Sequence, residues 1–317
     1  MRNPGKKRKK KKNKLKILVV ILAVLILGVI GLFLFIDHQI TGNSVDIVDQ
    51  DKVDPTAEEV LIGKEEPKDD QVYNVLLVGS DSRDPDADMG RSDSMMLISF
   101  NKAKGKATIV SFLRDCLVDI DGHGKSRLGH TYAYGGVGLT INTLNKVFDL
   151  DIQKYITINF DSLVNVIDEL GGIQVTLTEE EAEYYRSAGM PDIQAGTVTL
   201  TGSQALIHAR NRSLDSDFGR TRRQRSVMYG IYQKVLENRD PAALMSLINY
   251  CITQVNTNMS VTEIYELATS ALSVDNLQTQ QAVVPMDGSY NSINYEGMAV
   301  LDLDIDANKQ HIHELLY

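Results

Sequence analysis

The chain has 317 residues, with 33 basic and 42 acidic side chains and a formal net charge of −9. Ten of the basic residues lie in the first sixteen positions, which contain no acid, so the remainder carries a net charge of −19. Such an acidic chain is a poor general binder of anionic polymers; this argues against nucleic-acid binding and requires any anion site to be local. Its two cysteines, Cys116 and Cys251, are too few for a disulfide scaffold and either pair or stay buried as small apolar residues.

The basic N-terminus leads into an apolar segment, Ile17 to Ile36, that holds no charge in 20 residues. A helix of this length covers roughly 30 Å, the thickness of a bilayer core. A secretory signal peptide would have a shorter apolar region and a small-residue cleavage site, and neither is present here. We expect residues 1–16 to be a cytoplasmic tail and residues 17–36 an uncleaved anchor, with the rest of the chain outside the cell.

The chain beyond the anchor divides into a stalk and a domain. Residues 37–72 are rich in Asp, Glu and Lys and lack an apolar period, which is typical of a solvated stalk. Residues 73–317 are enough for one large folded domain.

Strand patterns open this domain. Val75 to Gly79 is typical of a buried strand, and Ser94 to Phe100 with Ala107 to Phe112 is typical of a hairpin. The elements expected after them are helices near 139–148, 162–170, 222–237, 241–254 and 260–272, strands at 155–159, 173–177, 281–284 and 298–303, and a terminal helix. This alternation predicts an α/β fold, in which helices flank a central mixed β-sheet.

Two capping boxes are expected, Thr178 with Glu181 and Ser260 with Glu263, and their role is structural.

Polar clusters flank the first two strands. Asp81 and Arg83 follow the strand at Val75 to Gly79, and Arg91 and Asp93 precede the next strand. Because ligands of open α/β sheets bind at strand ends, these four side chains are expected to face one crevice. The residues alone leave two interpretations open: a salt-bridge network, or a divalent cation held by the carboxylates and completed by substrate phosphates.

Arginines are concentrated further along the chain. Six of them fall in the sixteen residues from Arg210 to Arg225, and Arg114, followed by Asp115, ends the strand at Ala107 to Phe112. A guanidinium group can grip two oxygens at once, so clustered arginines are typical of a phosphate or pyrophosphate site.

Motifs from Tyr73 to Ile231 resemble, in order and spacing, the LytR-CpsA-Psr family of cell-wall glycopolymer ligases. The motifs are Val78-Gly79-Ser80-Asp81-Ser82-Arg83, Arg91-Ser92-Asp93-Ser94, Ser111 to Asp115, Tyr132-Ala133-Tyr134-Gly135-Gly136, Asn159-Phe160-Asp161, Leu170-Gly171-Gly172-Ile173, Ala209-Arg210-Asn211-Arg212, Asp217-Phe218-Gly219-Arg220 and Arg223-Gln224.

The resemblance implies an enzyme of the Gram-positive-type cell envelope. It would move a glycan 1-phosphate from an undecaprenyl-pyrophosphate carrier to a peptidoglycan sugar hydroxyl, forming a phosphodiester and releasing undecaprenyl phosphate. The polymer would be wall teichoic acid, capsule or another glycan, and the sequence does not say which. Two other functions remain open: a lipid-pyrophosphate phosphatase that uses water as the acceptor, and a non-catalytic protein that binds envelope polymer or regulates envelope stress.

The resemblance also assigns roles to individual residues. Asp81 and Asp93 correspond to the carboxylates that bind Mg²⁺. The arginines expected around the pyrophosphate are Arg83, Arg114, Arg210, Arg212, Arg220 and Arg223. Arg91 and Arg114 are expected to assist catalysis, and either Asp93 or Asp115 to accept the proton of the acceptor hydroxyl.

Three positions depart from the family pattern. Phe112-Leu113 replaces the usual Ile-Pro, Gly129 replaces an Asn found in many members, and Ser216 replaces a Gly. None of these departures removes a charged ligand.

Overall fold

The computed structural model describes residues 69–80, 92–237, 241–274 and 277–317. The expected cytoplasmic tail, anchor and most of the stalk lie outside the described residues. Among the helices that are described, none has the length and apolar character needed to cross a bilayer.

A six-stranded mixed sheet forms the centre of the domain, in the order β10-β3-β2-β1-β6-β9. Its strands are β1 (Val72–Ser80), β2 (Ser92–Asn101), β3 (Lys106–Phe112), β6 (Lys154–Ile158), β9 (Asn256–Thr257) and β10 (Gln278–Val284). Strand β1 pairs antiparallel with β2 and parallel with β6, and β3 pairs antiparallel with β2 and parallel with β10. The expected mixed sheet and the β2–β3 hairpin are confirmed.

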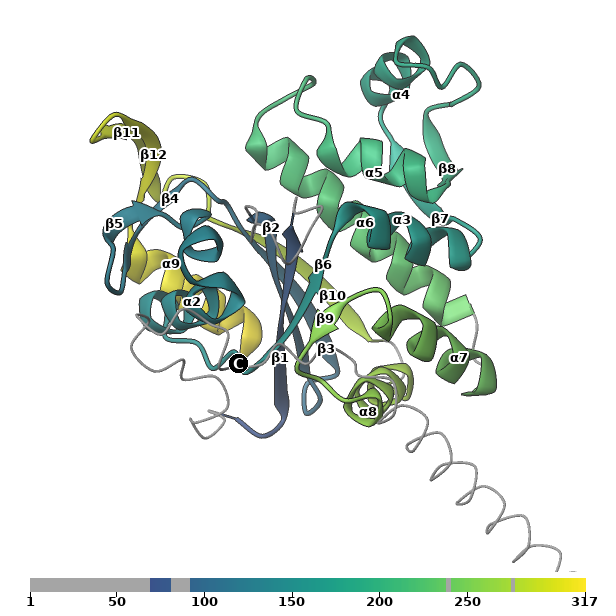
Figure 1. Cartoon of the computed structure of the whole chain (residues 1–317), viewed down its shortest axis with the longest axis horizontal. Helices are drawn as coiled ribbons and strands as arrows, with labels where there is room; N and C mark the ends of the chain where they lie inside the picture. The colour runs from purple at the N-terminus through teal and green to yellow at the C-terminus, as the bar shows by residue number, and fades with distance from the viewer. Residues whose placement is uncertain (1–68, 81–91, 238–240, 275–276) are drawn as a thin grey trace, which may run out of the picture. The chain divides into compact units, whose positions relative to one another are not determined.

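Helices cover both faces of this sheet (Figure 1). On one side lie α2 (His130–Phe148) and α9 (Ile305–Leu316); on the other lie α3 (Phe160–Glu169), α5 (Gly202–Arg210) and α6 (Asp217–Glu237). The remaining helices are α4 (Glu179–Ser187), α7 (Pro241–Ile252) and α8 (Val261–Leu272). There are two smaller sheets in the described part of the chain. One has four strands, β11 (Tyr290–Tyr295), β12 (Met298–Leu303), β4 (Cys116–Ile120) and β5 (Gly124–Arg127), in that order. The other pairs β7 (Ile173–Leu177) with β8 (Gly196–Leu200).

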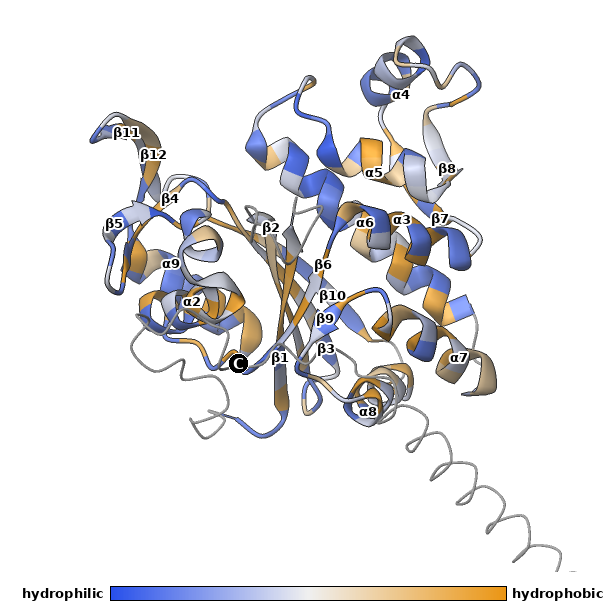
Figure 2. Cartoon of the chain, in the orientation of Figure 1, coloured by the Kyte–Doolittle hydropathy of each residue, from blue (hydrophilic) through white to orange (hydrophobic). Residues whose placement is uncertain are grey.

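The alternation of side chains along β1 divides its residues between two environments. Leu76 and Val78 are fully buried in the core that α2 and α9 share with the sheet, whereas Leu77 and Gly79 face the side of α3, α5 and α6. Hydrophobic residues run along the central strands, as Figure 2 shows. A second core joins α3, α5 and α6 to the β7–β8 hairpin. The space between the two cores is where the site lies.

The sequence missed some elements for identifiable reasons. Helix α2 begins at His130, nine residues before the expected start, because Gly135 and Gly136 depart from helical geometry and interrupt its periodicity. Strands β4 and β5 are short and partly charged, and they are held by pairing with each other and with β12. Cys116 and Cys251 are both free thiols, and Cys116 is buried.

Candidate active site

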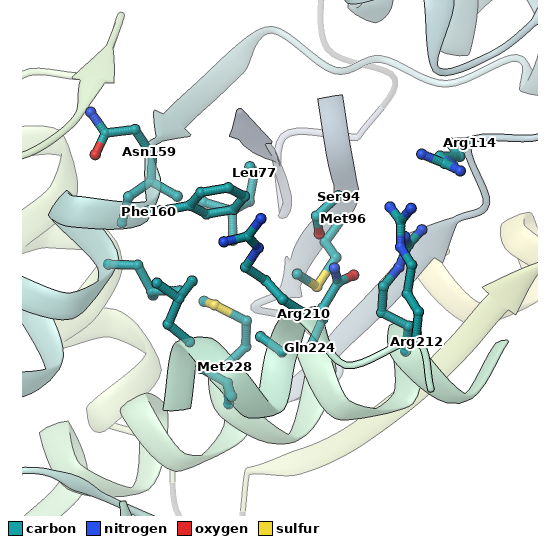
Figure 3. Close-up of a pocket in the computed structure, with 17 residues that line it drawn as sticks. Leu77, Ser94, Met96, Arg114, Asn159, Phe160, Arg210, Arg212, Gln224 and Met228 are labelled. Carbon is teal, nitrogen blue, oxygen red and sulfur yellow. The ribbon is translucent and has the colours of Figure 1, made fainter. Parts of the chain in front are cut away.

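A cavity of about 370 Å³ lies between the central sheet and the helices α3, α5 and α6 (Figure 3). Its floor comes from alternate residues of the strands: Leu77 and Gly79 on β1, Ser94 and Met96 on β2, and Ile158 on β6. We call it the arginine cavity, because four arginines from separate parts of the chain line it.

The arginines that line the cavity are Arg114, Arg210, Arg212 and Arg220. Arg114 follows β3, Arg210 is the last residue of α5, Arg212 lies in the loop after it, and Arg220 is in the first turn of α6. Arg220 is only 3% exposed and lies 3.1 Å from Asp217, measured from Nη2 to Oδ1. All four were predicted to contact a pyrophosphate, and the fold brings them to one space.

The opposite part of the cavity is apolar. Phe160 and Leu163 of α3 contribute to it, together with Leu206, Val227 and Met228 of α5 and α6. Figure 3 shows Phe160 and Met228 on one side of the cavity and Arg114 and Arg212 on the other. Arg210 lies between them, with its guanidinium carbon 4.2 Å from the centre of the Phe160 ring, a cation–π contact.

Asp115 lies beside this cationic region. Its carboxylate oxygens are 3.7 Å from Nε of Arg114 and 3.4 Å from Nε of Arg127. Burial raises the pKa of Asp115 above its ordinary value, and a hydrogen bond with Asp217 raises it further, against the lowering effect of the two arginines. A raised pKa makes a carboxylate a better proton acceptor than an ordinary one.

Arg223 lies apart from the four arginines that line the cavity. It does not line the cavity: its side chain is 1% exposed and is enclosed by Asp215, Glu181 and the backbone of Asn211. The guanidinium has three protein partners in the interior, and a role of Arg223 at the pyrophosphate stays a prediction.

Four of the predicted residues cannot be placed. Asp81, Arg83 and Arg91 lie outside the described residues, and the side chain of Asp93, in β2, is likewise not described. The β1–β2 register pairs Ser80 with Ser92, the neighbours of Asp81 and Asp93 in the sequence. Within the described part of the chain, no group of three His, Cys, Asp or Glu side chains has the arrangement of a metal site.

Several cavity residues were not among the predicted site residues. Gln224 and Ser94 stood in the motifs without a role, and Met96 was interpreted only as part of a strand. The period-2 alternation of β2 could have identified the face that Ser94 and Met96 share, but the layer that covers this face depends on the tertiary fold.

The fold and the site define a class: an α/β protein with a cavity that is cationic in one part and apolar in another. The chain belongs to the LytR_cpsA_psr family, whose sequence profile matches residues 33–314.

Named relatives share this sequence pattern. The polyisoprenyl-teichoic acid–peptidoglycan teichoic acid transferase TagT of Bacillus subtilis (strain 168) is 32% identical over 215 residues, covering 65% of this chain and 67% of the relative. The corresponding TagU of Enterococcus faecalis (strain ATCC 700802 / V583) is 37% identical over 195 residues, covering 59% and 60%. The chain therefore matches about two thirds of the length of these relatives or somewhat less.

Solved structures share the fold. TagT bound to LI-WTA superimposes with a TM-score of 0.65 at 26% identity, over 78% of this chain and 91% of TagT. The LytR-CPS2A-psr family protein YwtF (TagT) with bound octaprenyl pyrophosphate lipid gives a TM-score of 0.60 at 26% identity, over 80% and 93%.

Proposed function

We propose that this protein transfers a glycopolymer, as its 1-phosphate, from an undecaprenyl-pyrophosphate carrier to a sugar hydroxyl of peptidoglycan. The observation that carries the proposal is the division of the arginine cavity into a cationic part and an apolar part, which matches the pyrophosphate and the prenyl chain of such a donor. The names of the relatives and the lipid pyrophosphate bound to TagT support it.

The chemistry follows from charge. Transfer of a phosphoryl group needs neutralisation of its oxygens and of the leaving group more than it needs a nucleophilic side chain. Arg114, Arg210, Arg212 and Arg220 would hold the pyrophosphate and stabilise the charge that develops on the departing undecaprenyl phosphate. The acceptor oxygen attacks the phosphorus of the glycan phosphate, the bond to the bridging oxygen breaks, and the hydroxyl proton goes to Asp115 or Asp93. No external energy source is required, because cleavage of the pyrophosphate linkage drives the transfer.

Mg²⁺ and the membrane anchor are part of the same proposal. Asp81 and Asp93 would hold the ion, since the sequence places them next to the paired strand ends at Ser80 and Ser92. Bound there, Mg²⁺ would neutralise pyrophosphate charge. The anchor at residues 17–36 would hold the domain on the outer side of the cell membrane, where its lipid donor is found.

The test uses the full chain in detergent with a polyprenyl-pyrophosphate-linked oligosaccharide, with and without peptidoglycan oligomers. The expected products are glycan joined to peptidoglycan and an equal amount of polyprenyl phosphate, both detected by mass spectrometry. Release of polyprenyl phosphate with no joined glycan would show a phosphatase instead. Binding without turnover would favour the non-catalytic alternative.

A chelator and metal-replacement series tests the cation. Activity should be lost in EDTA and return with Mg²⁺, and Asp93→Asn should raise the Mg²⁺ concentration needed for half-maximal rate. Full activity in EDTA would remove Mg²⁺ from the proposal.

A further inference from the structure

An ion-pair network centred on a buried arginine includes part of the loop that joins α5 to α6. We call residues 211–216 the arginine loop, because Arg210 precedes it, Arg212 belongs to it and Arg220 follows it closely. The centre of the network is Arg223, whose side chain is 1% exposed. Its Nη1 donates to Oδ2 of Asp215 at 3.0 Å and its Nη2 to Oδ1 at 2.6 Å, the paired geometry of a strong guanidinium–carboxylate contact.

Arg223 also holds the backbone of the arginine loop. Its Nη2 donates to the carbonyl oxygen of Asn211 at 2.8 Å. Asn211 is the residue between Arg210 and Arg212, both of which line the cavity. One buried guanidinium therefore fixes the chain at the point where the two cavity arginines diverge, and fixes the far end of the same loop through Asp215.

Gly219 makes this contact possible. A Cβ atom added at Gly219 would overlap the carboxylate of Asp215, which lies directly over it. Gly219 is in the first turn of α6, where alanine would otherwise favour the helix over glycine. The absence of a side chain at this position thus gives Asp215 the space from which it reaches Arg223.

Glu181 connects the network to α4. One of its oxygens completes the capping box by accepting from the backbone N–H of Thr178 at 3.0 Å. The other lies 3.1 Å from Nη2 of Arg222 and 3.5 Å from Nη1 of Arg223. Glu181 is 4% exposed, and its charge is balanced by the buried Arg223 and by the exposed Arg222.

We propose that Arg223, Asp215 and Glu181 are positioning residues that hold the arginine loop so that Arg210, Arg212 and Arg220 face the cavity, and that Gly219 provides the space for Asp215. The three residues act through the cavity arginines and do not touch the ligand. The part that concerns the ligand rests on the proposed function, whereas the coupling between Gly219 and Asp215 does not.

The first experiment is a double-mutant cycle on the full chain in detergent, with thermal unfolding as the measurement. Gly219→Ala should lower the Tm by several degrees, because it displaces the Asp215 carboxylate. In the Asp215→Ala background the same change should leave the Tm unchanged or raise it, since only the helix preference of alanine remains. An equal fall in both backgrounds would overturn the proposal. Asp215→Ser serves the same purpose if Asp215→Ala does not fold.

The second experiment measures ligand binding by Glu181→Gln, with Glu179→Gln as the matched control. Both glutamates are in the first turn of α4, but Glu179 is exposed and pairs with Arg186 at the surface. Glu181→Gln should weaken the binding of polyprenyl pyrophosphate roughly tenfold, as expected for the loss of about one charge-assisted hydrogen bond. Polyprenyl alcohol has the tail but no pyrophosphate, and its affinity for Glu181→Gln should stay within about twofold of that for the unaltered chain. The affinity of Glu179→Gln for each of the two ligands should also stay within about twofold of that value.

The possible outcomes separate the two proposals. If Glu181→Gln weakens the binding of both ligands equally, Glu181 has a general structural role and the positioning proposal is overturned. If the unaltered chain binds no polyprenyl pyrophosphate, the proposed function fails, while the thermal cycle still decides whether Gly219 acts through Asp215.

Discussion

The six arginines from Arg210 to Arg225 have different environments, although they are close in the sequence. Arg210, Arg212 and Arg220 line the cavity, Arg223 is buried among carboxylates, and Arg222 is 54% exposed at the surface. Arg225 donates from Nε to Gln281 of β10 at 3.2 Å. Because a helix turns 100° per residue, arginines one or two positions apart in α6 point in different directions. The charge of the run therefore does not say which members bind a ligand.

The role of Arg210 in ligand binding can be tested directly by substitution. Arg210→Ala should weaken polyprenyl-pyrophosphate binding by about 1.5–3 kcal/mol, or roughly 10- to 100-fold, because one charge-assisted contact is lost. Arg210→Lys should recover only part of the affinity, since an ammonium cannot bind two oxygens in a plane or stack on Phe160 as a guanidinium does. Isothermal titration of the full chain measures both, with Arg186→Ala on α4 as a surface control. Unchanged affinity in Arg210→Ala would remove this residue from the site.

Asp115 predicts a pH dependence of stability. Its pKa in the folded protein is raised above the ordinary value of 3.8, chiefly by burial. The folded state therefore holds this proton more tightly than the unfolded state, and the resulting stabilisation is full below the ordinary pKa and is lost as the pH rises through the raised one. Asp115→Asn should remove this dependence, because asparagine does not titrate. As the pH rises from about 4, the free energy of unfolding of the wild type should therefore fall relative to that of the variant. Urea unfolding at a series of pH values measures it; a difference that does not vary with pH would contradict the raised pKa.

At the scale of elements, close backbone contacts set the positions of the helices that carry the site. Gly202, the first residue of α5, packs against the backbone of Val164 in α3, where an added Cβ would overlap the Val164 carbonyl. Gly129, one of the departures from the family pattern, approaches the backbone of Arg114: its N–H donates to the Arg114 carbonyl at 2.8 Å, and a Cβ would lie 2.8 Å from that of Arg114. The contact gives this glycine a structural role beside a cavity arginine.

Gly202→Ala should therefore force α5 away from α3. We expect a loss of about 1–3 kcal/mol in the free energy of unfolding, the usual effect of overpacking, measured by urea denaturation. Ser203→Ala, at the next and exposed position of the same helix, is the control and should change stability by less than about 0.5 kcal/mol. Equal stability of the two variants would show that α3 and α5 separate without strain.

At the scale of the whole molecule, the cavity exists because two cores share one sheet. The core with α2 and α9 holds one face of β1 and β2, and the layer of α3, α5 and α6 covers the other without filling the space above it. The apolar part of this space includes Met228 of α6 and the cationic part includes Arg212 of the loop after α5, and Figure 3 shows these two side chains on different sides of the cavity.

Filling the apolar part should separate the two contributions to binding. Met228→Trp places a larger side chain in the part of the cavity that Phe160 and Leu163 also line. It should weaken the binding of long-chain polyprenyl pyrophosphate by about tenfold or more, because less of the tail can be buried there. A pyrophosphate with a single prenyl unit should bind almost as before. Competition binding with the two ligands measures the ratio; equal weakening of both would mean that the tail does not occupy this part of the cavity.

The sequence by itself determined the class of the fold and most of the helices and central strands, because these depend on local periodicity and capping. Its short motifs selected the four arginines that line the cavity, but together with Arg223, which does not line it. It did not determine β4, β5 and the start of α2, which depend on pairing with distant strands and on a helix interrupted at Gly135 and Gly136. Tertiary structure alone decided that Arg223 turns inward to Asp215 and Glu181 while Arg220, three residues earlier, turns to the cavity. The reason is physical: sequence gives the charge of a side chain, but its direction and its partner depend on which elements pack around it.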